Sequence, residues 1–217
     1  MATRIELKRG SFGDIYCEET PDSARTIRDL RAASWPGLAR FLARREAKAL
    51  TRLDGIDGVP ALIRVERDRL IRSFLAGDVM YRDAPQSPEY FREALRLVRR
   101  LHRRRVAHND LAKEANWIRR DDRTPGIVDF QLAVCFSRRS RLFRMLARED
   151  LRHLLKHKRH YFPEALTARQ REILATPMWP ARGWRLLIKP GYLFLTRRVL
   201  GWPERDGAAE RQRPARG

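Results

Sequence analysis

Two stretches of the sequence decide the fold: residues 108–117 are HNDLAKEANW, and residues 127–131 are IVDFQ. They place two carboxylates, Asp110 and Asp129, and one side-chain amide, Asn116, between apolar residues. Carboxylate and amide oxygens are hard ligands of the kind that Mg²⁺ prefers, and Mg²⁺ takes only one or two protein carboxylates. The two stretches are therefore candidates for a magnesium site.

In order and spacing, the two stretches resemble the catalytic loop and the metal-binding aspartate of protein-kinase-like phosphotransferases, H-x-D-L-x-x-x-N followed by D-F-G. Asp129 lies thirteen residues after Asn116, which is the separation that this family uses. The resemblance implies that Asp110, with His108 beside it, orients or deprotonates the attacking hydroxyl. It also implies that Asp129 and Asn116 hold Mg²⁺ against the phosphates of ATP. The alternative is a polar turn before a hairpin, with Asp129 solvated at a strand end.

The match departs from the family pattern in three places. Asn116 lies six residues after Asp110, where the pattern has five, so either the loop bulges by one residue or Glu114 shares the metal. Gln131 stands where the family has glycine. No A-P-E motif follows, and a chain without a long activation segment resembles the RIO kinases and the bacterial lipopolysaccharide-core (Kdo/heptose) kinases. Asp150 resembles the helix aspartate that braces the catalytic loop in these families, with a surface carboxylate as the alternative.

Residues 4–16 predict a hairpin, because apolar and polar residues alternate beside the turn Gly10, Ser11, Phe12 and Gly13. By resemblance, this turn is a reduced glycine-rich loop that covers the phosphates of ATP. Glycine lets backbone N–H groups approach a phosphate closely. The full G-x-G-x-x-G is not present, and an ordinary turn is the alternative.

A strand over residues 24–28 places Arg28 where the family has the lysine of V-A-I-K. Arginine keeps the charge, but its guanidinium is a planar fork and not a compact point charge. An exposed strand charge is the alternative, in which case Lys8 can reach the phosphates instead. Glu46 lies eighteen residues after Arg28, where the resemblance implies the glutamate that pairs with the basic residue of the strand. A surface ion pair is the alternative for Glu46.

Apolar periodicity predicts the remaining elements, which are helices over residues 37–53, 88–102 and 142–160 and strands over residues 61–65 and 70–75. Ser87 is the expected N-cap of the second helix, and a single break in the third helix is an open alternative. By resemblance, residues 72–75 form a hinge that meets adenine through backbone groups. His153, His157 and His160 lie among basic residues and are expected on a solvated face rather than at a metal.

The composition is strongly basic, with 47 Lys and Arg against 27 Asp and Glu and a net charge of +20. This charge attracts nucleic acid, anionic membranes or acidic substrates, although codon bias also produces an arginine excess. Two cysteines form no disulfide framework, which indicates a reducing compartment. The first ten residues are polar and no run reaches the ~18 apolar residues of a spanning helix. We expect a cytoplasmic protein, with peripheral contact at an anionic inner-membrane surface as an alternative.

The expected domain division is an N-lobe over residues 1–76 and a C-lobe with the catalytic loop over residues 77–178. Residues 179–203 are basic and aromatic. We expect them to pack against the C-lobe, and a membrane-interface segment is the alternative. Residues 204–217 are polar and are expected to form a disordered tail.

These features predict an α+β fold, a reduced two-lobed protein-kinase-like fold with a strand-rich N-lobe and a mostly helical C-lobe. By resemblance, the function is that of an ATP- and Mg²⁺-dependent kinase that transfers the γ-phosphoryl to a hydroxyl, similar to serine/threonine protein kinases. The alternatives are a lipopolysaccharide-core sugar kinase and a nucleotide-binding pseudokinase with a regulatory role. A nucleic-acid-binding protein has the charge but no recognised motif here. The acceptor, a protein or a glycolipid sugar, stays open, as does the oligomeric state.

Overall fold

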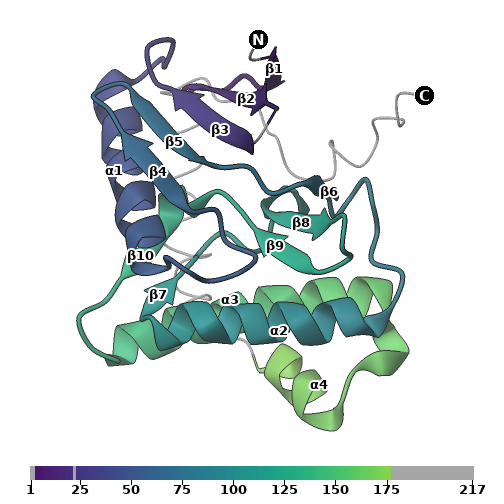
Figure 1. Cartoon of the computed structure of the whole chain (residues 1–217). Coiled ribbons are helices and arrows are strands. Elements are labelled where there is room, and N and C mark those ends of the chain that lie inside the picture. Colours follow the sequence, from purple (N-terminus) through teal and green to yellow (C-terminus); the bar gives the residue numbers. More distant parts are fainter. Residues whose placement is uncertain (1–2, 22, 177–217) are drawn as a thin grey trace.

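The computed structural model describes residues 3–21 and 23–176. The first part of the chain forms an antiparallel sheet in the order β1-β2-β3-β5-β4, with helix α1 (Pro36–Arg52) beside it (Figure 1). Its strands are β1 (Thr3–Lys8), β2 (Asp14–Thr20), β3 (Ser23–Asp29), β4 (Leu62–Val65) and β5 (Arg69–Ser73). The hairpin predicted over residues 4–16 is confirmed, with Ile5 opposite Cys17.

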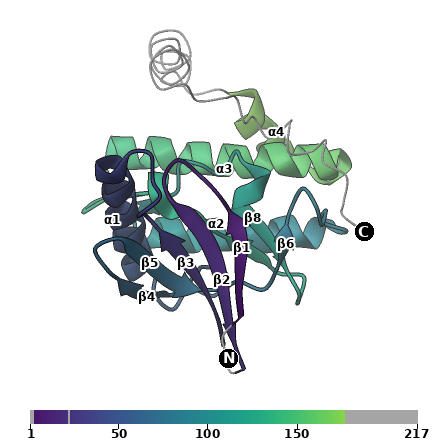
Figure 2. The same cartoon turned by 90° about the horizontal axis from the view of Figure 1, so that it is seen from above.

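The second part of the chain is built on helices, which lie in the lower part of Figure 1, and its two long helices lie side by side (Figure 2). The helices are α2 (Pro88–Arg103), α3 (Arg141–Tyr161) and α4 (Ala168–Ala175). The strands are β6 (Gly77–Val79), β8 (Trp117–Arg120) and β9 (Pro125–Ile127) in one sheet, and β7 (Val106–Ala107) with β10 (Val134–Cys135) in another. The predicted α+β, kinase-like arrangement is confirmed. The division after residue 76 and the segments 179–203 and 204–217 stay predictions, the last two outside the described residues.

The N-cap predicted at Ser87 is confirmed, and the structure adds a second cap at Ser140. Ser87 caps α2, because its hydroxyl accepts a hydrogen bond from the Glu89 backbone N–H at 3.2 Å. Ser140 caps α3 in the same way, through the Phe143 N–H at 3.1 Å. Helix α3 runs without a break from Arg141 to Tyr161, so the alternative of an interrupted helix is wrong.

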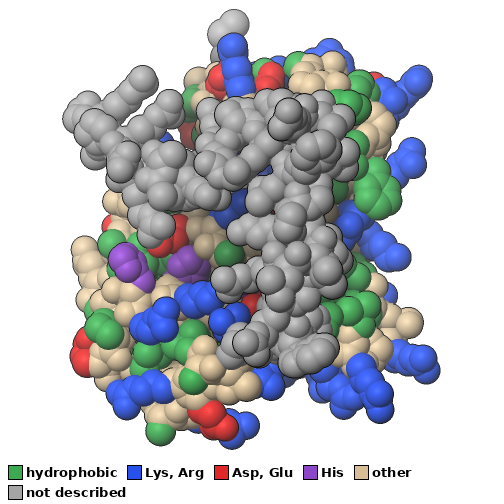
Figure 3. All heavy atoms as spheres, turned by 180° about the vertical axis from the view of Figure 1, so that it is seen from behind, with side chains coloured by type: hydrophobic (Ala, Val, Ile, Leu, Met, Phe, Trp, Pro, Cys, Tyr) green, Lys and Arg blue, Asp and Glu red, His purple; other side chains and the backbone are tan. Residues whose placement is uncertain are grey.

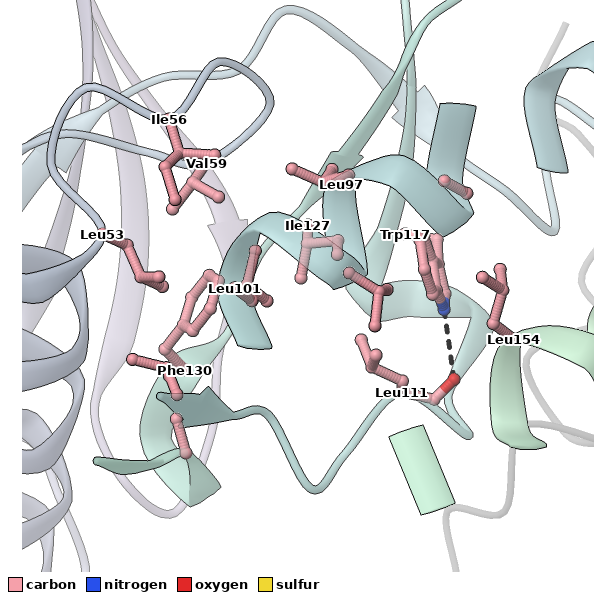
Figure 4. Close-up of a cluster of buried hydrophobic side chains, with 14 of the residues drawn as sticks. Leu53, Ile56, Val59, Leu97, Leu101, Leu111, Trp117, Ile127, Phe130 and Leu154 are labelled. Atoms are coloured by element: carbon pink, nitrogen blue, oxygen red, sulfur yellow. Dashed lines mark hydrogen bonds between the residues drawn. The ribbon is translucent and has the colours of Figure 1, made fainter. Parts of the chain in front are cut away.

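One apolar core joins the two parts of the chain. Leu53 directly follows α1, Leu101 comes from α2 and Trp117 from β8, and all three are at most 1% exposed (Figure 4). The buried Trp117 indole donates its N–H to the Leu111 carbonyl oxygen at 3.1 Å, as a buried indole requires. The core therefore fixes the loop at residues 108–117 relative to both α1 and α2.

None of the helices within residues 3–21 and 23–176 combines the length and the apolar character that crossing a bilayer needs.

The core position of Leu101 gives a stability prediction. Leu101→Ala should lower the free energy of unfolding by about 2–5 kcal/mol, because Leu101 is fully buried and the truncation leaves a cavity. Leu38→Ala is the matched control, since Leu38 is 41% exposed and its truncation should change the free energy by no more than about 0.5 kcal/mol. Urea denaturation followed by circular dichroism measures both. Equal losses for the two variants would contradict the assigned core.

Candidate active site

The loop at residues 108–117 is anchored at its start by Asp150 of α3, which is 1% exposed. The two carboxylate oxygens of Asp150 accept hydrogen bonds from the backbone N–H groups of His108 (2.8 Å) and Asn109 (2.9 Å). The His102 Nε2 atom lies 3.1 Å from the same carboxylate. A buried carboxylate needs such donors to offset its lost hydration. The prediction that Asp150 braces the catalytic loop is therefore confirmed, and the alternative, a carboxylate on the helix surface, is wrong.

Two side chains of the loop orient Asp110. Asn116 Nδ2 donates to the Asp110 carboxylate at 3.0 Å and to the Asp110 backbone carbonyl at 2.8 Å. Lys113 Nζ lies 2.7 Å from the same carboxylate. Both hydrogen bonds use the Nδ2 group of Asn116 as the donor. No described residue donates to its amide oxygen, which can therefore accept from or bind another group.

The extra residue of the loop is absorbed by a 3₁₀ turn over Glu114–Asn116. Glu114 points to α3, where it accepts a hydrogen bond from the Tyr161 hydroxyl at 3.3 Å and lies 3.8 Å from His157 Nδ1. The second ring nitrogen of His157, Nε2, lies 2.9 Å from the Leu111 carbonyl oxygen. Of the two alternatives, a bulged loop and a metal shared by Glu114, the structure shows the bulge. The contacts of Glu114 attach this bulge to α3.

The expected solvated histidine face is wrong for part of α3. His157 is 7% exposed and Lys158 is 6% exposed. Burial, with Lys156 acting in the same direction, lowers the pKa of His153 to about 4, so this ring is neutral at pH 7. His157 contacts the bulged loop at Leu111 and Glu114, whereas Lys158 donates to the Gln170 side chain of α4 at 3.0 Å. His160 is exposed, as expected.

Asp129 sits beside Asn116 in a constrained backbone conformation. Its φ of 65° and ψ of 66° lie in the left-handed region, which costs a residue other than glycine roughly 1 kcal/mol or more. The preceding residue, Val128, donates its N–H to the Asn116 carbonyl at 3.0 Å and lies 3.1 Å from His108 Nε2 through its own carbonyl oxygen. Backbone strain that neighbouring contacts hold in place is a recurring mark of functional sites.

Arg28 and Glu46 meet Asp129 at one place. Arg28 Nε lies 3.5 Å from Glu46 Oε2, and Arg28 Nη2 lies 3.3 Å from Asp129 Oδ1. With its amide oxygen facing the guanidinium, Gln131 accepts from Arg28 Nε at 3.2 Å and from Nη2 at 3.1 Å. Glu46 has no solvent exposure and Arg28 has 4%. The alternatives for these two residues, an exposed strand charge and a surface ion pair, are therefore wrong, and Asp129 is not simply solvated.

Arg72 is a member of this cluster that the sequence did not reveal. It is 5% exposed and its guanidinium pairs with Glu46 Oε1. The residue was expected in an adenine-binding hinge, but it lies within β5 opposite Thr26. The N–H groups of Ser73 and Phe74 donate to the carbonyls of Ala61 and Ala24. The signal in the sequence that could have indicated the role of Arg72 is its charge directly after the apolar pair Leu70-Ile71.

The pKa values show how the charges of the cluster balance. Burial lowers the pKa of Arg72 to about 9, with repulsion from Arg28 acting the same way, so Arg72 stays charged at pH 7. Burial by itself would raise the pKa of Asp129, but Arg28, Arg72, Lys113 and Lys8 together hold that pKa below its usual value. Asp129 is thus an anion at neutral pH, as a metal ligand must be.

The turn at Gly10, Ser11, Phe12 and Gly13 is shaped by a close backbone approach. Gly13 has a φ of 104°, and a Cβ atom there would lie 2.4 Å from the Asp29 carbonyl oxygen. Its N–H donates to the Gly10 carbonyl at 3.0 Å, while the Ser11 carbonyl accepts from the Ser34 N–H at 3.1 Å. Phe12 packs against the small apolar cluster beside α1. Only glycine fits at position 13, and the turn is fixed to the end of β3.

The oxygen donors of the site suit magnesium. Asp129 offers a carboxylate and Asn116 an amide oxygen that no described residue occupies. Within the described residues, no three His, Cys, Asp or Glu side chains gather as a metal site. This sparse set excludes a zinc cage at these positions and fits Mg²⁺, which keeps several of its waters.

The charge cluster gives a second prediction. Glu46→Gln should lower the free energy of unfolding by roughly 3 kcal/mol, because two buried guanidinium groups lose the carboxylate between them. Glu66→Gln is the control, since Glu66 pairs with the exposed Arg64 and such pairs contribute less than about 1 kcal/mol. Chemical denaturation at pH 7 measures both variants. A Glu46→Gln protein as stable as wild type would show that the cluster carries no structural role.

Comparison with known proteins places the chain in a family. The sequence profile of the RIO domain matches residues 9–171. The chain is similar in structure to the Rio2 kinase from Chaetomium thermophilum, with a TM-score of 0.57 and 18% identity over 77% of this chain and 61% of that one. It is also similar to the ADP/Mg²⁺-phosphoaspartate complex of that kinase, with a TM-score of 0.59 and 17% identity over 79% of this chain and 60% of that one.

The chain thus spans less than two thirds of the Rio2 kinase chains that it matches. No curated protein matches it in sequence. The profile covers most of the chain, including both motif stretches, the strand with Arg28 and the helix with Asp150, so the protein belongs to the RIO domain family.

Proposed function

We propose that this RIO domain protein is a phosphotransferase that moves the γ-phosphoryl of ATP to a hydroxyl, with a serine or threonine of a protein as the acceptor. One observation carries this proposal: Asn116 holds the Asp110 carboxylate with its side chain and, through its backbone carbonyl, accepts from Val128, the residue before Asp129. Family membership supports the fold and the kind of chemistry. The Mg²⁺ and ADP of the related Rio2 kinase complex support the same cofactors here.

Asp110 acts as the general base. Its carboxylate is fixed by Asn116 and Lys113, so it presents a constant geometry to an incoming hydroxyl and can accept the proton as the phosphoryl leaves ATP. His108 is fully buried and lies against Phe130 with 4.6 Å between ring centroids, so it positions the loop and does not touch a substrate. His108 is thus a positioning residue rather than a second acid or base.

Asp129 and Asn116 would hold Mg²⁺ with one carboxylate and one amide oxygen. When bound, Mg²⁺ neutralises charge on the phosphates of the nucleotide. Arg28 takes the place of the usual strand lysine, and Glu46 keeps its guanidinium beside Asp129. The turn at residues 10–13 would cover the phosphates through the backbone N–H group of Ser11, because those of Gly10 and Gly13 already donate within the turn region.

A nucleotide-binding pseudokinase is the second candidate, and one observation favours it. The Arg28 guanidinium already spans Glu46, Asp129 and Gln131, so fewer of its N–H groups remain for a phosphate. Incubation of the purified protein with γ-labelled ATP separates the two candidates. Label on the chain itself or on an added protein supports the phosphotransferase, and nucleotide binding without any transfer supports the pseudokinase. A sugar acceptor and an anionic membrane surface have no support in the family match.

The proposed metal ligand gives the third prediction. Asp129→Asn should abolish Mg²⁺-dependent ATP binding, and it should cost less stability than Glu46→Gln, because the Asp129 side chain is 27% exposed and Arg28 keeps its contact with Glu46. Asp121→Asn, in an exposed turn, is the control and should bind as wild type does. Isothermal titration with and without Mg²⁺ measures the binding. An Asp129→Asn protein that loses stability but keeps its affinity for Mg²⁺ and ATP would make Asp129 a structural residue.

The proposed base gives the fourth prediction. Asp110→Asn should bind ATP with near-native affinity, because the nucleotide contacts belong to Asp129, Asn116 and the first part of the chain. Its rate of phosphoryl transfer should fall by about 10²–10⁴-fold, the usual scale for a positioned acid–base group. Transfer from labelled ATP under single-turnover conditions measures the rate. Full activity in this variant would remove Asp110 from the mechanism.

A further inference from the structure

A basic groove lies between α2 and α3, in the second part of the chain. Its cavity volume is about 380 Å³, which is the size of a small binding pocket. Five arginines line it, and all five are exposed: Arg99, Arg103, Arg139, Arg144 and Arg148. On the face seen from behind, Lys and Arg side chains are spread widely, with acidic and hydrophobic side chains between them (Figure 3).

The groove follows from the periodicity of the two helices. On α2, Arg99 and Arg103 are separated by four residues and share one face. On α3, Phe143, Ala147 and Leu151 repeat at the same spacing and form the floor. Phe143 and Ala147 are at most 9% exposed, so the floor is apolar and only its rim is charged.

The charge of the groove is not neutralised within the described residues. Earlier on α2, Arg92 pairs with Glu89 and Arg96 pairs with Glu93, each one turn away. The five groove arginines have no carboxylate partner among residues 3–21 and 23–176, and no acidic side chain lines the groove. Like charges four residues apart on a helix cost stability, so this arrangement leaves a surface that favours an anionic occupant.

We propose that this groove binds an acidic peptide segment of a partner protein, with an apolar side chain of that segment on the floor and its carboxylates on the arginine rim. The inference is independent of the phosphotransfer proposed above. Arginine suits this role because its guanidinium fork matches a carboxylate in two hydrogen bonds.

Other occupants fit less well. The basic residues 182–198 of this chain and a second copy of a chain of net charge +20 would both meet the groove with like charge. Single-stranded nucleic acid gains affinity by stacking bases on aromatic faces. Phe143 is only 4% exposed and meets His102 and Phe136 edge-on, so it offers no open ring face.

The groove also adjoins the anchor of the candidate active site. His102 lines the groove and lies 3.1 Å from Asp150, the residue that holds the backbone of His108 and Asn109. A bound segment would therefore lie one hydrogen bond from the residue that fixes this loop.

The test is fluorescence anisotropy with the full chain and a short labelled peptide in which one leucine is flanked by glutamates. Charge reversal of two rim residues, Arg144→Glu with Arg148→Glu, should weaken binding roughly tenfold or more, since each exposed pair contributes up to about 1 kcal/mol and reversal adds repulsion. The matched control is Arg169→Glu with Arg171→Glu on α4, where both residues are exposed and lie outside the groove. This control should bind nearly as wild type does.

Two further arms decide the nature of the occupant. A peptide with glycine in place of leucine should bind more weakly, because it leaves the apolar floor empty. Equal affinity of the two peptides, or equal loss in the two charge-reversed proteins, would mean general electrostatic attraction and would overturn the proposal. A single-stranded RNA that binds the groove more tightly than the leucine peptide would overturn it in favour of nucleic acid. Arg144→Gln with Arg148→Gln, a milder change, guards against loss of folding.

Discussion

The candidate site depends on one carboxylate that has no contact with solvent. Glu46 lies between two buried arginines, Arg28 and Arg72, and Arg28 reaches Asp129 from the other part of the chain. Two cations and two anions thus compensate one another where burial would make any single charge costly. The position of Asp129 relative to the first sheet follows from this compensation, because Arg28 belongs to β3 and Asp129 follows β9.

A second buried carboxylate fixes the other half of the site. Asp150 takes two backbone N–H groups of the loop at residues 108–117, and the bulge of that loop is held by Glu114 against α3. The loop is longer than the family pattern by one residue, yet Asn116 still reaches Asp110. The extra residue therefore changes how the loop is anchored, while the contact of Asn116 with Asp110 and the backbone bond from Val128 to Asn116 are both formed.

Much of this could be predicted from the sequence, because the signals are local. Short stretches of sequence contain Asp110, Asn116 and Asp129 at a recognisable spacing. The cap at Ser87 is likewise predicted from the residues next to it. The partnership of Glu46 with Arg72 could not be predicted in this way, since strand pairing places Arg72 beside Arg28 only after the sheet forms. The burial of His157 likewise depends on the tertiary path of the bulged loop. Local sequence patterns were therefore enough to predict the candidate site residues, whereas the buried ion pairs around them depend on contacts between distant parts of the chain.

The most direct test of this account locates a bound metal ion. Mn²⁺ can replace Mg²⁺ with ATP, and its unpaired electrons broaden the NMR signals of nearby amides. The account predicts that Mn²⁺ with ATP broadens the backbone amide signals of Asn116 and Asp129 and leaves those of Arg144 and Ala147, in the groove between α2 and α3, sharp. Sharp signals at Asn116 and Asp129 in the presence of bound Mn²⁺ and ATP would contradict it, because the metal would then lie elsewhere.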